Sequence, residues 1–185
     1  MDSETLMLVS MVVAVVLLGL AAWVYTSRRR RVNLRERFGP EYERTVQAVG
    51  PARADAVLQE RAERVSRFNL RKITQDQADA FVREWRRIQA RFVDDPAGAV
   101  GEADQLVTQV MTARGYPLED FDRRADDLSV DHPVVVHNYR TARTLALRRQ
   151  RGEAGTEELR QAVVNYRALF DELLEVDTHG VRRAS

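Results

Sequence analysis

The chain contains 185 residues, of which 44% are hydrophobic and 31% are charged, and its formal net charge at pH 7 is +1. It has no cysteine, which excludes disulfide bonds and thiolate chemistry and leaves histidine and carboxylates as the ligands for any zinc site. Without one long apolar segment near the N-terminus, roughly 150 residues remain, which is enough for one modest domain with a hydrophobic core.

Residues 6–25, LMLVSMVVAVVLLGLAAWVY, predict a transmembrane helix. They carry no charge, and a helix of this length, at about 1.5 Å per residue, matches the hydrocarbon core of a bilayer. Trp23 and Tyr25 are expected at the membrane–water interface. A cleavable signal peptide would instead need a basic N-terminal region and correctly spaced small residues, but Asp2 and Glu4 lie there. A buried core helix would rarely be this long and apolar, so an uncleaved span is favoured.

Basic residues follow this segment closely, and no arginine or lysine precedes it. The positive-inside rule therefore predicts an N-terminus outside the cell and a cytoplasmic chain from residue 26 onward. Anionic lipid attracts basic side chains near a membrane surface, so membrane lipid is an expected partner. The arginines expected to lie closest to lipid are Arg28, Arg29, Arg30, Arg31, Arg35 and Arg37.

Charge is distributed unevenly along the cytoplasmic part. Residues 26–73 hold 13 basic and 6 acidic side chains, a net charge of +7, whereas residues 74–185 hold 16 basic and 20 acidic side chains, a net charge of −4. A basic stretch beside a membrane is more typical of a topology determinant and lipid contact than of a nucleic-acid site. Because the distal part is net negative and its aromatic residues fall on apolar stripes, no nucleic-acid partner is expected.

The basic stretch predicts two helices after an extension of the membrane helix. Pro40 fits the first position of a helix that ends near Val49, and Pro51 begins a second helix that ends near Arg67. Their apolar faces are thin, since arginine and glutamate interrupt the alanine, valine and leucine positions. Residues 26–73 are therefore expected to form a basic juxtamembrane stalk that needs a partner helix, from the same chain or from another subunit.

Residues 74–176 predict a helical bundle, because apolar residues recur at spacings of three and four and no segment alternates with period two. Together these patterns predict an all-α protein with an N-terminal transmembrane helix, a helical stalk and a small cytoplasmic bundle. Residues 1–5 would form a short extracytoplasmic N-terminus, and residues 177–185 a disordered tail. The expected helix starts and stops are the capping box of Thr74 and Gln77, Asp95-Pro96, Gly115, Pro117, His132-Pro133, Gly152 and Thr156.

The sequence holds three histidines, His132, His137 and His179. His132 and His137 are five residues apart, so they do not share a helix face as ligands at i and i+4 would. His132 beside Pro133 is typical of a cap or turn, and His179 lies in the expected tail. No metal site is predicted.

Aspartates could supply acid–base chemistry, and three groups of them stand out: Asp94-Asp95, Asp126-Asp127 and Asp131. Each lies at a predicted helix boundary, where a carboxylate accepts hydrogen bonds from free backbone N–H groups, so capping is the favoured role. The sequence has no GxSxG, HExxH, Walker or dinucleotide-binding pattern. It therefore predicts no catalytic residue and no cofactor.

Two sets of arginines lie on the predicted bundle helices. Interhelical ion pairs explain them better than nucleic-acid contacts, because the region around them is net negative. The sets are Arg83, Arg86, Arg87 and Arg91, and Arg140, Arg143, Arg148, Arg149 and Arg151.

Three runs of sequence resemble a group of uncharacterised bacterial single-pass membrane or secreted proteins: RERFGPEYERTV, RFVDDPAGAV with EADQLV, and YPLEDFDRRADDLSVDHP with NYR. In that group a transmembrane helix precedes a helical C-terminal domain. The resemblance covers nearly the whole chain and implies the architecture only, since no activity is assigned to the group.

These observations predict a single-pass protein of the bacterial plasma membrane whose cytoplasmic bundle binds another protein or a second copy of itself. One alternative is an enzyme of unrecognised type, which requires Asp94, Asp126, Asp131 and His132 to converge in one pocket. Another alternative is a sensor of the lipid surface that acts through residues 28–73.

Overall fold

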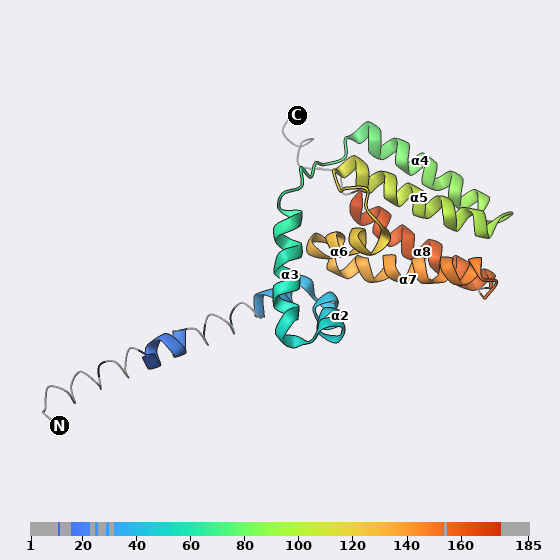
Figure 1. The fold of residues 1–185 in the computed structure, drawn as a ribbon. Coiled ribbons are helices and arrows are strands. Elements are labelled where there is room, and N and C mark those ends of the chain that lie inside the picture. The colour runs from blue at the N-terminus through green and yellow to red at the C-terminus, as the bar shows by residue number, and fades with distance from the viewer. Residues whose placement is uncertain are drawn as a thin grey trace, which may run out of the picture.

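A computed structural model describes residues 11, 16–22, 25, 29, 32–153 and 155–174 (Figure 1). All regular structure in these residues is helical, which confirms the predicted all-α class. Residues 32–38 are helical and lead into the labelled elements. These are α2 (Pro40–Val49), α3 (Pro51–Val65), α4 (Gln75–Arg91), α5 (Pro96–Arg114), α6 (Phe121–Asp131), α7 (Pro133–Gln150) and α8 (Thr156–Leu173).

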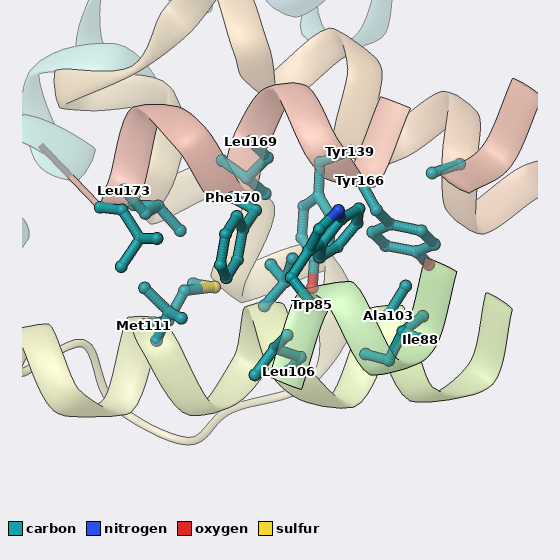
Figure 2. Close-up of a cluster of buried hydrophobic side chains, with 14 of the residues drawn as sticks. Trp85, Ile88, Ala103, Leu106, Met111, Tyr139, Tyr166, Leu169, Phe170 and Leu173 are labelled. Carbon is teal, nitrogen blue, oxygen red and sulfur yellow. The ribbon is translucent and has the colours of Figure 1, made fainter. Parts of the chain in front are cut away.

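The main core lies between α4, α5, α7 and α8, which run alongside one another (Figure 1). Trp85 of α4 is fully buried and stacks on Phe170 of α8, with ring centroids 4.9 Å apart (Figure 2). Tyr139 of α7 and Tyr166 of α8 meet edge to face nearby. The apolar stripes recognised at spacings of three and four are therefore the faces that these helices bury against one another.

Most helix ends follow the predicted signals. Thr74 and Gln77 form the capping box of α4, and the Asp95 carboxylate accepts a hydrogen bond from the Gly98 N–H at the start of α5. Gly115 ends α5 with a φ of 96°, in the left-handed region that favours glycine. A side chain there would also meet the Asn69 carbonyl oxygen at 2.4 Å, so glycine is required on two counts.

Two predicted boundaries were wrong. Pro117 does not begin α6, because Asp120 is the N-cap and accepts a hydrogen bond from the Arg123 N–H. Thr156 is the first residue of α8, and its N-cap is Gly155, whose N–H donates to the Glu158 carboxylate. The end of α3 lies at Val65, within two residues of the predicted end near Arg67.

Helices α2 and α3 form a hairpin that packs on the bundle, α3 against α6 and α2 against α7 (Figure 1). A second, smaller apolar cluster lies in this contact, where Phe38, Leu58 and Val65 pack with Val130 of α6. The partner helices that the thin apolar faces required therefore come from the same chain.

Within the part of the chain that the structure describes, no helix is both long enough and apolar enough to cross a membrane. Of the predicted span, only residues 11, 16–22 and 25 are described. The span at residues 6–25 therefore stays a prediction. Also outside the described residues are Trp23, Arg28, Arg30, Arg31, the N-terminal residues 1–5 and the tail 177–185.

Candidate interaction site

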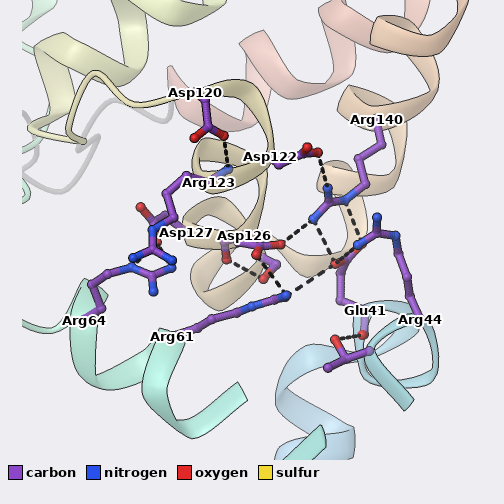
Figure 3. A network of polar contacts seen from close by, with 12 residues as sticks. Glu41, Arg44, Arg61, Arg64, Asp120, Asp122, Arg123, Asp126, Asp127 and Arg140 are labelled. Atoms are coloured by element: carbon purple, nitrogen blue, oxygen red, sulfur yellow. Dashed lines mark hydrogen bonds and ion pairs between the residues drawn. The ribbon is translucent and has the colours of Figure 1, made fainter. Parts of the chain in front are cut away.

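Four charged side chains from four helices meet where the hairpin contacts the bundle (Figure 3). The members of this charge ring are Glu41 of α2, Arg61 of α3, Asp126 of α6 and Arg140 of α7. Both arginines lie within ion-pair distance of both carboxylates. The ring therefore joins α2 to α7 through Glu41 and Arg140, and α3 to α6 through Arg61 and Asp126.

Arg140 makes the most contacts in the charge ring. Its Nε donates to Glu41 Oε1 at 3.3 Å and its Nη2 to Glu41 Oε2 at 3.3 Å, while Nη2 also donates to Asp126 Oδ1 at 2.8 Å. Arg61 Nη2 lies 3.0 Å from Asp126 Oδ2, and its Nη1 lies 3.9 Å from Glu41 Oε2. Within the ring, each carboxylate thus has two cationic partners, as buried charges require.

Burial makes the charge ring sensitive to the loss of any member. The Glu41 side chain is 3% exposed, and Arg61 and Arg140 are 11% and 13% exposed. Burial lowers the pKa of Arg61, and the carboxylates of Asp126 and Glu41 oppose that shift. Since these groups have given up hydration, their mutual attraction is what keeps them charged inside the protein.

A second ion pair reinforces the contact between α3 and α6. Arg64 Nε and Nη2 both donate to Asp127 Oδ1, at 2.9 and 2.5 Å. Asp127 is only 2% exposed. Burial raises the pKa of this carboxyl group, and the bond from Arg64 opposes the shift without overcoming it.

The predicted capping role of Asp126 and Asp127 was wrong. Both lie in the interior of α6, which continues to Asp131. Their side chains point to the arginines of α3 and α7 and do not reach free backbone N–H groups at a helix end (Figure 3). Arg61 and Arg64, three residues apart on α3, were the sequence signal for this pairing, because residues at that spacing share a helix face.

A groove of about 520 Å³ lies beside the charge ring, between α2 and α7. Arg44 of α2 is half exposed at its edge, and its Nη1 lies 3.7 Å from Glu41 Oε2. In the described part of the chain, no carboxylate lines this groove. Its described lining consists of Arg44, Gln47, His137, Arg140, Thr141, Thr144 and Leu145.

The arginines predicted to lie near lipid differ in their surroundings. Arg29 is helical and exposed. The same holds for Tyr25, the aromatic residue predicted to lie at the membrane–water interface. Arg35 forms an ion pair with Glu43, and Arg37 lies 3.9 Å from Asp131. At least two of the six arginines therefore have carboxylate partners within the protein.

The four residues required for an acid–base site do not converge. Asp94 lies between α4 and α5 and lines a cavity with Arg149, whereas Asp126 belongs to the charge ring. Asp131 lines a different cavity at the end of α6. His132 caps α6 and places Nδ1 3.0 Å from Glu172 Oε1. Among the described residues, no group of three histidine or acidic side chains is arranged to hold a metal ion.

The arginine faces of the bundle are only partly paired. Arg91 of α4 contacts Glu102 of α5, Arg143 of α7 contacts Asp104 of α5, and Arg148 of α7 contacts Glu158 of α8, as the ion-pair interpretation predicted. Arg87 also lies 3.5 Å from Glu102, and Arg151 pairs with the nearby Glu153. Within the described chain, no ion pair is found for Arg83, Arg86 or Arg149.

Comparison of the chain with protein-family models, curated proteins and solved structures found no match. The resemblance to bacterial membrane or secreted proteins stays a prediction. Functional assignment therefore depends on the charge ring, the groove and the apolar N-terminal segment.

Replacing Glu41 by glutamine is expected to lower the free energy of unfolding by about 3–5 kcal/mol, because it removes one of the two carboxylates that the buried arginines share. Glu43→Gln is the matched control on the same helix. Its side chain is half exposed and pairs with Arg35 at the surface, so a loss below about 1 kcal/mol is expected. Urea unfolding followed by circular dichroism measures both values, and equal losses would contradict the role assigned to the charge ring.

Asp127 is expected to make stability fall as pH rises above 3.8, the ordinary pKa of its carboxyl group. Because burial raises its pKa in the folded state, the folded protein binds a proton in a pH range where the unfolded chain does not. The proton is lost as pH rises through the folded-state pKa, and the stabilisation disappears with it. In urea unfolding over a pH series, Asp127→Asn should gain stability relative to wild type as pH rises. If wild type instead gained stability relative to Asp127→Asn as pH rises, the hydrogen bond from Arg64 would outweigh the effect of burial on the pKa of Asp127, which would contradict this prediction.

Proposed function

We propose that this protein is a single-pass, membrane-anchored helical protein whose bundle acts as a protein-interaction or scaffold module at the cytoplasmic face of a bacterial plasma membrane. The observation that carries the proposal is a set of solvent-exposed apolar side chains near the N-terminus. In the described part of residues 11–25, the exposed large hydrophobic residues are Met11, Val16, Leu17, Leu18, Leu20 and Tyr25, each at least half exposed.

Covering such side chains is strongly favourable. Fully burying one large aliphatic side chain contributes about 1.5–3 kcal/mol, so a helix that presents several of them needs an apolar environment. Gly19 lies among them, and among the described residues a Cβ added there would meet no other part of the chain within 4 Å, apart from its own helix backbone and chain neighbours. A bilayer is the cover that best suits this segment, because the predicted span is uncharged over 20 residues and a run of arginines follows it.

The charge ring supports a positioning role for the chain after the anchor. Residues 32–38 lead directly into the α2–α3 hairpin, and buried ion pairs attach that hairpin to α6 and α7. A membrane anchor joined to this hairpin would therefore hold the bundle in a defined place relative to the membrane surface.

An interaction role is favoured over a catalytic one by the distribution of polar groups. The aspartates and His132 that an acid–base site would need occupy separate places, whereas cationic side chains gather at an open groove. The partner would be another protein or a second copy of the chain.

The proposed topology can be tested by single-cysteine labelling, because the natural chain has no cysteine to give background. A membrane-impermeant maleimide should label Ser3→Cys in intact cells but label Arg86→Cys only after the membrane is opened. Labelling of both variants in intact cells, or of Arg86→Cys alone, would contradict the proposed orientation.

Anchoring can be tested in the same cells with Leu17→Arg combined with Leu18→Arg. Each arginine near the middle of the span adds about 2.5–3.5 kcal/mol to the free energy of insertion, so the double variant should leave the membrane fraction. The control, Leu17→Ala with Leu18→Ala, should stay there. Retention of the arginine variant after carbonate washing would contradict an anchor at these residues.

A further inference from the structure

The groove between α2 and α7 has an excess of positive charge that the charge ring does not neutralise. Arg44, Arg61 and Arg140 all share Glu41 as a partner. Asp126 provides a second partner for Arg61 and Arg140, but among the described residues Glu41 is the only carboxylate within ion-pair distance of Arg44. Three guanidinium groups therefore share two buried or half-buried carboxylates.

One further carboxylate lies near these arginines, but it compensates them weakly. Asp122 Oδ1 is 3.9 Å from Arg140 Nη1, and its side chain is 89% exposed. Water and salt screen an exposed pair at that separation. The surplus charge belongs to Arg44, whose half-exposed side chain lies at the edge of the groove.

The rest of the lining adds hydrogen-bonding groups and one apolar surface. Gln47 and His137 are exposed, and Thr141 and Leu145 are half-buried. The Thr144 hydroxyl donates to the Arg140 carbonyl and can still accept a hydrogen bond. Such a lining complements a carboxylate accompanied by an apolar side chain.

We propose that this α2–α7 groove binds an acidic helical or extended segment of a partner protein, with Arg44 as the residue that recognises a carboxylate. This inference rests on the proposed function and names the chemical class of its partner. Among the described residues, no carboxylate lines the groove, and the charge of Arg44 is only partly compensated. An acidic segment is therefore the occupant whose charge complements the groove.

A protein segment fits this groove better than a phosphate group does. Phosphate sites commonly use backbone N–H groups at the start of a helix, but the lining residues lie inside α2 and α7, where the N–H groups bond within the helix. The groove is an open trough of about 520 Å³, which suits several side chains in a row.

The test uses the full chain in nanodiscs of phosphatidylcholine and a fluorescent helical peptide with glutamate at every fourth position and leucine between. Binding is followed by fluorescence anisotropy. Arg44→Glu and Gln47→Glu should each raise Kd about tenfold or more, because each places a carboxylate opposite the peptide's own. Arg86→Glu makes the same charge change as Arg44→Glu on an exposed position of α4, and it should bind as wild type does.

Three results would overturn the proposal. An equal loss in Arg86→Glu would mean that overall charge attracts the peptide, and equal binding of a peptide with lysine in place of glutamate would exclude recognition of carboxylates. Binding of phosphatidylserine vesicles that depends on Arg44 and displaces the peptide would identify lipid as the occupant. Circular dichroism of each variant verifies that the fold is retained.

Failure of this inference can be separated from failure of the proposed function. If the cysteine labels and the arginine variants place the chain in the membrane but the peptide binds independently of Arg44, the proposed membrane-anchored module is supported and the proposal of an acidic partner is wrong. If peptide binding depends on Arg44 but the chain is not anchored, the groove is supported as a binding site and the proposed membrane role is wrong.

Discussion

The Glu41 carboxylate is the group on which the arrangement of the helices most depends. It is almost completely buried, and arginines of α2, α3 and α7 all lie within 4 Å of it. A buried carboxylate has lost its hydration, so it is stable only where cations surround it. Those cations then need further carboxylates, which Asp126 of α6 supplies. The need to satisfy each charge thus brings four helices to one point.

Two features follow from this constraint. The α2–α3 hairpin shares only a small apolar cluster with the bundle, so the ion pairs of the charge ring and of Arg64 with Asp127 contribute the specificity of the contact. The charge ring also leaves the Arg44 side chain half exposed beside an open groove. The same arrangement that fixes the hairpin therefore leaves positive charge at the surface of the α2–α7 groove.

The helices themselves could be predicted because local residues determine them. The capping box at Thr74, the Asp95-Pro96 start and the left-handed Gly115 each satisfy backbone groups within a few residues. The charge ring could not be predicted in this way, since Glu41 and Arg140 are 99 residues apart in sequence. Sequence reasoning placed Asp126 and Asp127 at a helix boundary because aspartate commonly caps helices. It did not connect them with the arginines of α3, because Arg64 and Asp127 are 63 residues apart in sequence.

The most direct test of this account measures whether the hairpin is held on the bundle. Since the chain lacks cysteine, spin labels can be placed on Arg53→Cys of α3 and Leu147→Cys of α7, and the distance between them measured by pulsed electron paramagnetic resonance. A rigid junction predicts one narrow distance distribution, which Glu41→Gln broadens. A broad distribution in the otherwise unaltered protein, or a narrow one that survives Glu41→Gln unchanged, would contradict the claim that the buried charge ring holds the hairpin in place.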